Sequence, residues 1–215
     1  MKRADLDAIR AARRARKLVT LTTDLATGAQ TLGADARPTG VVSEGNSEIF
    51  VQRFEPSPRL IVVGAVHIAQ RLVPMARLAD FAVTVIDPRG AFATAARFPD
   101  VALLNEWPDQ AFAKLAPDET TAVVTLSHDP KLDDPALVAA LGSPVFYIGA
   151  LGSQKTQARR RERLTAAGFG EADLARIHAP VGLAIGAVSP GEIALSIMAE
   201  IIAVRRGRTL APIAR

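Results

Sequence analysis

The feature that most constrains the fold of this chain is an apolar, β-branched run that ends at a glycine and passes directly into a helical pattern. The run is Leu60–Val63, the glycine is Gly64, and helical spacing of apolar residues begins at His67. A buried strand, a glycine turn and a helix in immediate succession open a Rossmann βαβ unit, in which a dinucleotide lays its pyrophosphate on the helix N-terminus. The sequence therefore predicts an α/β fold.

The glycine pattern in this turn departs from the dinucleotide fingerprint. Gly64 holds the first glycine position, Val66 the second, and Ala69 the third, where alanine is tolerated. The middle glycine lets the backbone approach phosphate without a Cβ in the way. A valine there keeps the signal for the fold and weakens the signal for a nicotinamide cofactor.

From residue 59 onward, short apolar runs alternate with helical patterns, which predicts a Rossmann-like, doubly wound parallel sheet. The strand candidates are Leu60–Val63, Ala82–Ile86, Ala102–Leu104, Ala122–Leu126 and Val145–Ile148. The helix candidates are His67–Leu78, Pro108–Leu115, Pro135–Leu141, Lys155–Ala167, Glu171–Arg176 and Pro190–Arg205.

A proline pair at Pro56 and Pro58 blocks helix and forces extended backbone just before this alternation begins. We therefore expect two modules, residues 1–58 and residues 59–215. The first module combines a short basic helix with a small set of β-hairpins, one of which turns at residues 44–47.

The composition restricts the class of protein. Apolar residues make up 49% of the chain, and no apolar run approaches the ~20 residues that a membrane span needs. The absence of cysteine excludes disulfides and thiolate metal sites, and it fits a reducing compartment. The net charge is +4, and the basic residues cluster in helical patterns. The whole chain contains one Trp and one Tyr, too few for stacking on bases. We therefore interpret the basic clusters as solvated helix faces or as a surface for an anionic ligand. We expect a cytoplasmic protein with no nucleic-acid or membrane partner.

Polar residues follow two of the predicted strands. Asp87 closes the second strand, 23 positions after Gly64 (87 − 64 = 23), where an acid in dinucleotide binders accepts the ribose hydroxyls; the alternative is a turn aspartate. Ser127, His128 and Asp129 follow the fourth strand, where ligands collect in α/β sheets. We favour a ligand-contacting loop here over a metal site; the alternative is a polar loop with Asp133 or Asp134 capping a helix that begins at Pro135.

The segment Gly149–Thr156 follows the fifth predicted strand and opens a helix. It combines two glycines, a hydroxyl cap at Ser153 and a cation at Lys155, which suit an anion at a helix N-terminus. An ordinary capped helix start explains the same residues equally well. The spacing is not that of a Walker A loop.

Six segments in order along about residues 59–208 are more specific than any one of them. They are Gly-Ala-Val-His-Ile-Ala, Val-Ile-Asp, Ser-His-Asp-Pro-Lys-Leu-Asp-Asp, Tyr-Ile-Gly-Ala-Leu-Gly-Ser, Pro-Val-Gly-Leu-Ala-Ile-Gly-Ala and Ser-Pro-Gly-Glu-Ile-Ala. Together they resemble the XdhC/CoxI family, the accessory proteins of xanthine dehydrogenase and related molybdenum hydroxylases.

The resemblance implies a role in molybdenum cofactor maturation. Family members bind the pterin cofactor (molybdopterin) as cargo, support exchange of an oxo for a sulfido ligand with a cysteine desulfurase, and deliver the product to the apo-enzyme. The motifs and the resemblance together give these expected cofactor-binding residues: Gly64, Ala65, Val66, His67, Asp87, Ser127, His128, Asp129, Gly149, Gly152, Ser153 and Lys155. They assign no catalytic residue and no metal ligand.

Longer family members carry an N-terminal domain with a Ser-Gly-Gly-Cys motif, and this sequence contains neither that motif nor any cysteine. We therefore expect a short form that binds and hands over cofactor rather than a catalyst that relays sulfur covalently. Two alternatives stay open: an NAD(P)-dependent oxidoreductase with Asp87 on the ribose, and a non-catalytic scaffold for the same assembly. The strands of the N-terminal hairpins also offer edges for pairing into a homodimer.

Overall fold

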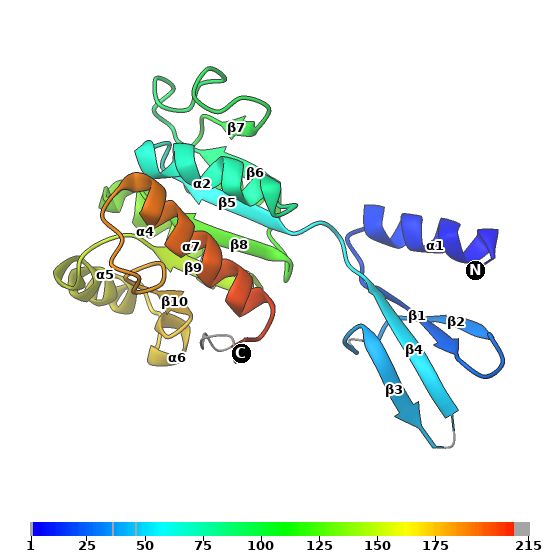
Figure 1. Cartoon of the computed structure of the whole chain (residues 1–215). Coiled ribbons are helices and arrows are strands. Elements are labelled where there is room, and N and C mark those ends of the chain that lie inside the picture. Colours follow the sequence, from blue (N-terminus) through cyan, green and yellow to red (C-terminus); the bar gives the residue numbers. More distant parts are fainter. Residues whose placement is uncertain (1, 36, 46, 209–215) are drawn as a thin grey trace. The chain divides into compact units, whose positions relative to one another are not determined.

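The computed structural model describes residues 2–35, 37–45 and 47–208 (Figure 1). The chain divides into two compact units, Met1–Ser57 and Pro58–Arg215. Asn46 of the predicted second turn and residues 209–215 of the predicted second module lie outside the described residues. No helix within the described ranges is both long enough and apolar enough to cross a membrane.

The N-terminal unit is a four-stranded antiparallel sheet with one helix. The strand order is β2-β1-β4-β3, and both hairpins pair in continuous antiparallel register. Its core is small, since only Ile9, Leu21, Ile49 and Val51 are buried hydrophobic residues among the described part of this unit. The elements are α1 (Arg3–Arg14), β1 (Val19–Asp24), β2 (Gln30–Gly33), β3 (Gly40–Glu44) and β4 (Ser47–Phe54).

The C-terminal unit is a six-stranded parallel sheet in the order β10-β9-β8-β5-β6-β7. Counted along the chain from β5, this is the order 3-2-1-4-5-6 of dinucleotide-binding folds, with the reversal between β5 and β8. The strands are β5 (Arg59–Val63), β6 (Ala82–Ile86), β7 (Ala102–Leu104), β8 (Thr121–Thr125), β9 (Tyr147–Ala150) and β10 (Ile177–His178). The helices are α2 (His67–Leu78), α3 (Pro108–Leu115), α4 (Pro130–Leu141), α5 (Gln154–Ala166), α6 (Glu171–Leu174) and α7 (Pro190–Arg205).

Both faces of this sheet are buried, which is why its strands are continuous apolar runs rather than alternating ones. Successive side chains of β5 point to opposite faces: Leu60 and Val62 pack under α2 and α7, while Ile61 and Val63 pack on the side of α3, α4 and α5. Figure 1 shows α2 and α7 lying side by side over one face. The predicted fold class, a Rossmann-like parallel sheet with a small β module, is confirmed.

Several element boundaries differ from those predicted, and one strand was not predicted. The fourth helix begins at Pro130 rather than Pro135, because Asp129 caps it by accepting a hydrogen bond from the backbone N–H of Lys131; the predicted cap at Asp133 or Asp134 is therefore wrong. The fifth strand of the sheet begins and ends two residues later than predicted. The short edge strand β10 was not predicted, since two residues carry no periodic pattern.

Candidate functional site

The loops after β5 and β8 are in close contact at the point where the strand order reverses. Gly64 has φ +100°, and a Cβ on it would lie 2.9 Å from the backbone nitrogen of Ser127. Only glycine fits this contact, because a side chain at this φ is strained and would also collide with backbone. Ligands of open α/β sheets bind in the crevice at this reversal point, so the two loops frame the expected site.

Asp87 connects the loop after β5 to the loop after β6. Its carboxylate accepts hydrogen bonds from the Ala65 N–H at 2.8 Å and from the Arg89 backbone and side chain at 2.8–3.0 Å, and Asp87 is fully buried. Burial alone would raise the pKa of Asp87, but the hydrogen bonds from Arg89 and Ala65 outweigh it and lower the pKa. The carboxylate thus holds the backbone of the turn at Gly64 through the Ala65 N–H, and the ribose contact stays a prediction.

A buried ion pair connects the loop after β8 to the loop after β9. The Asp133 carboxylate accepts a hydrogen bond from the Ser127 hydroxyl at 2.6 Å and lies 3.2 Å from the Arg160 guanidinium. That guanidinium also donates to the carbonyl of Leu151 at 3.0 Å. The two side chains are 1% and 4% exposed, so α4 and α5 hold both loops through a contact that is closed to solvent.

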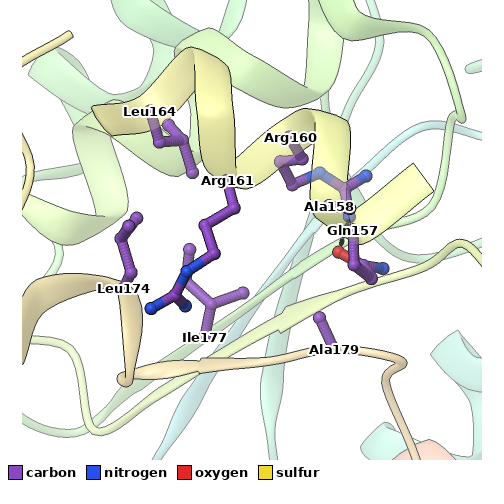
Figure 2. A pocket seen from close by; sticks show the side chains of 8 residues that line it. All are labelled: Gln157, Ala158, Arg160, Arg161, Leu164, Leu174, Ile177 and Ala179. Atoms are coloured by element: carbon purple, nitrogen blue, oxygen red, sulfur yellow. Dashed lines mark hydrogen bonds between the residues drawn. The ribbon is translucent and has the colours of Figure 1, made fainter. Parts of the chain in front are cut away.

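Gln157 completes this bracing. Its amide donates to the carbonyls of Ala150 and Gly152, and its side-chain oxygen accepts from Arg160. Figure 2 shows Gln157 and Arg160 side by side on α5, at a cavity of about 160 Å³ whose apolar lining includes Leu164. The backbone of the loop after β9 is therefore fixed from the helix that follows it.

The ionisation of this pair reflects its burial. Desolvation raises the pKa of Asp133 and lowers the pKa of Arg160, and the attraction between the two charges opposes both shifts. The Nε of Arg160 is buried without a hydrogen-bond partner among the described residues. Burying these two charges therefore costs desolvation free energy, and we interpret the pair as one that positions the loops after β8 and β9.

The side chains that remain exposed above the braced backbone are those of His67, His128, Asp129, Ser153 and Lys155. His128 has φ +62°, a left-handed conformation that is uncommon for a residue with a side chain and is concentrated at functional sites. The Asp129 carboxylate caps α4 and the Ser153 hydroxyl caps α5, so each already accepts a hydrogen bond from a backbone N–H of its helix.

Gly149 is placed differently from the expectation. It lies inside β9 rather than in the loop after it, and the space beside it is filled by Val181 and Tyr147, which a Cβ would meet at 2.6 and 2.9 Å. Its role is to allow that packing. Gly152, by contrast, lies in the loop with φ +142°.

A larger cavity of about 540 Å³ adjoins the loop after β5, between the first turns of α2 and α7. Among the expected residues only His67 lines it. The other lining residues are Gln70, Arg71, Arg97, Ser189, Pro190 and Gly191. Because the cations come from a helix and from the β6–β7 connection, no local motif in the sequence indicates that they meet.

A polar cluster holds the segment that leads into α7. Glu200 accepts hydrogen bonds from the Tyr147 hydroxyl at 2.5 Å and the Gly182 N–H at 2.8 Å, and lies 3.1 Å from Nδ1 of His178. Tyr147 and His178 stack with ring centroids 4.6 Å apart. Gly182 is required there, since a Cβ would collide with the Ser196 hydroxyl. No group of three or more His, Asp or Glu side chains within the described ranges is arranged to hold a metal ion.

Comparison with known proteins gives a consistent result. The family model of the XdhC Rossmann domain matches residues 60–201. The chain is 37% identical over 164 residues to a Bacillus subtilis (strain 168) protein named as a probable xanthine dehydrogenase subunit; the alignment covers 74% of this chain and 47% of that protein. It is 32% identical over 168 residues to the "Molybdenum cofactor insertion chaperone PaoD" of Escherichia coli (strain K12), covering 78% of this chain and 46% of that protein.

The fold has a close counterpart among solved structures. A crystal structure described as a xanthine dehydrogenase from Bacillus halodurans superposes with a TM-score of 0.79 at 26% identity, covering 95% of this chain and 67% of that chain. The chain spans about half the length of the two curated relatives.

Proposed function

The chain belongs to the XdhC family, and from that premise we propose that it binds molybdenum cofactor as cargo and assists its sulfuration and its insertion into a xanthine dehydrogenase-type molybdenum hydroxylase. The observation that carries the proposal is the family match over residues 60–201, which includes every loop of the site. The names of the two curated relatives support it, one as part of a xanthine dehydrogenase and one as an insertion chaperone.

The geometry of the loops fits a carrier. Their backbone is braced by buried contacts, while the side chains of His67, His128 and Lys155 are exposed above it. Such a surface offers donors and a cation to the polar edges of a pterin and to phosphate, with little backbone ordering on binding. Preorganisation of this kind lowers the entropic cost of binding the cofactor.

The proposed partners are the apo-form of the molybdenum hydroxylase and a cysteine desulfurase. The 215 residues contain no cysteine, so no thiol on this chain can carry the sulfur. We therefore assign delivery of sulfur to the desulfurase, and assign to this chain the holding of the cofactor while its ligand is exchanged.

The test is a binding titration of the purified chain with molybdenum cofactor released from a donor enzyme, run in parallel with NADH and NADPH. Tight, near-stoichiometric cofactor binding that weakens about tenfold, or about 1.4 kcal/mol, in His128→Ala and Lys155→Gln is the expected result. Arg159→Gln, which removes an exposed cation one turn further along α5, is the matched control and is expected to bind normally.

Two outcomes would contradict the proposal. Binding of a nicotinamide cofactor alone, lost in Asp87→Ala and strengthened in Val66→Gly, would indicate an oxidoreductase, because a glycine at position 66 lets backbone approach a pyrophosphate. Binding of neither ligand, with retained binding to the apo-hydroxylase, would indicate a scaffold.

A further inference from the structure

The cavity between the first turns of α2 and α7 is lined by cationic side chains. Its lining contains Arg71 and Arg97 together with the ring of His67, and it contains no acidic side chain. Its volume of about 540 Å³ is within the range of small-molecule sites. A cavity with two guanidinium groups and no lining carboxylate selects anions.

The two arginines have no carboxylate partner among the described residues. Arg71 is exposed, and within that part of the chain it makes no hydrogen bond or ion pair. Arg97 donates to the carbonyl of Phe92 at 2.7 Å and to the side-chain oxygen of Gln70 at 3.2 Å, and both acceptors are neutral. These contacts orient Arg97 and leave its charge uncompensated. Other arginines of the same domain behave differently, since Arg89 and Arg160 are each paired with a carboxylate.

The two helix ends at this cavity are also unequal. At α7, the Ser189 hydroxyl accepts the N–H of Glu192, and the Glu192 carboxylate accepts the N–H groups of Val188 and Ser189. At α2, the cap residue Val66 has no side chain that can accept, and the first turn contains no acid. The positive end of α2 therefore adds to the field of the arginines, whereas that of α7 is neutralised by Glu192.

We propose that this cavity is a phosphate-binding site, in which Arg71 and Arg97 grip the phosphate end of the cofactor and so extend the site beyond the loops of the sheet edge. The assignment of that phosphate to a pterin cofactor rests on the function proposed above. Arginine is suited to this task because its planar fork matches phosphate oxygens in a bidentate way. His67 lines the cavity and, as the first residue of α2, directly follows the loop after β5, so the cavity adjoins that loop.

The test uses two probes, inorganic pyrophosphate and molybdenum cofactor released from a donor enzyme, titrated into the whole purified chain. Arg71→Gln and Arg97→Gln are each expected to weaken the binding of both probes about tenfold, and wild-type binding is expected to weaken with added salt. Arg77→Gln removes the same charge from the last turn of α2 and is the control expected to bind like the wild type. Arg71→Gln keeps the test sound if Arg97→Gln perturbs the loop that it supports.

The outcomes separate this proposal from the function on which it rests. Wild-type binding of the cofactor with no loss in either variant would overturn the phosphate site and leave the proposed function standing. Pyrophosphate binding that both variants lose, without cofactor binding by the wild type, would contradict the proposed function and retain the anion site. An equal loss of probe binding in Arg77→Gln would show that only the net charge of the protein matters, and it would overturn the site.

Discussion

Two arginine-bearing regions of the C-terminal domain use their charges in opposite ways. Around α4 and α5, Arg160 is buried, pairs with Asp133, and holds the loops after β8 and β9 in place. At the first turns of α2 and α7, Arg71 and Arg97 face a cavity without an acidic side chain in its lining. One region therefore uses its charges to fix the geometry of the backbone, and the other keeps them available for a ligand.

The largest effect is expected from breaking the buried pair on one side. Arg160→Met leaves Asp133 as an uncompensated buried carboxylate, which we expect to lower the free energy of unfolding by about 3–5 kcal/mol in urea denaturation. The double variant Asp133→Leu with Arg160→Met is expected to lose less, since no unpaired charge remains.

The neighbouring pair between the same two helices provides the control. Asp134 and Arg163 also join α4 to α5, but their side chains are 21% and 40% exposed. Arg163→Met is expected to cost under about 1 kcal/mol, as exposed pairs do. Equal losses for Arg160→Met and Arg163→Met would show that burial does not distinguish the two pairs and that Arg160 does not brace the loops.

A somewhat smaller loss is expected from Gly64→Ala, which breaks the contact between the loops after β5 and β8. The substitution adds strain at φ +100° and a contact at 2.9 Å with the Ser127 backbone, for a combined cost of about 3 kcal/mol in thermal or urea unfolding. Gly168 has nearly the same φ, +99°, with nothing within 4 Å of an added Cβ. Gly168→Ala should therefore show only the cost of backbone strain, about 1 kcal/mol. Similar losses of unfolding free energy in the two variants would argue against a close approach of the loops.

The next effect concerns Asp87 and depends on pH. Asp87→Asn removes charge-assisted hydrogen bonds to Arg89 and Ala65 and is expected to cost about 2 kcal/mol near neutral pH. Because the pKa of Asp87 is lowered on folding, its carboxylate stabilises the protein above its unfolded pKa, and this contribution is lost as the pH falls through the folded value.

The measurement is the free energy of unfolding as a function of pH. The wild type should lose stability on acidification below about pH 4 more steeply than Asp87→Asn. Parallel curves for the two proteins would mean that the carboxylate is not held by these donors.

The smallest effect on stability is expected at the cavity between α2 and α7. Arg71→Gln removes no contact with the described part of the chain, so the unfolding free energy should change by no more than about 0.5 kcal/mol. A loss comparable with that of Arg160→Met would remove the contrast between the two regions. Phosphate binding, unlike stability, should fall markedly in Arg71→Gln.

Much of the fold follows from the sequence, because buried parallel strands and amphipathic helices leave periodic signals. The helices His67–Leu78, Pro108–Leu115 and Pro190–Arg205 begin and end where their caps, prolines and apolar spacing predict. The family resemblance is likewise confirmed by the match over residues 60–201. Where two start signals compete, as with Pro130 and Pro135, the choice depends on which side chain can cap the helix, and only the folded loop decides it.

The connections within the site are harder to predict, since they join residues far apart in the chain. Arg160 belongs to a basic cluster that the sequence pattern assigns to solvent, yet it is 3% exposed and pairs with Asp133. The meeting of Arg71 with Arg97 depends in the same way on how the β6–β7 connection passes α2. Local spacing identifies which loops lie at the sheet edge, whereas tertiary packing determines which side chains remain available there.

The missing side-chain cap of α2 has a consequence for how occupancy of the cavity can be observed. The amide protons in the first turn of a helix have no carbonyl four residues earlier within the helix, and Val66 supplies no acceptor in its place. These amides should exchange rapidly with solvent deuterium, whereas the amide of Ala65, bonded to Asp87, should exchange slowly. An anion bound against this turn would slow exchange of the His67 and Ile68 amides. Hydrogen exchange at these two residues would therefore measure occupancy of the cavity.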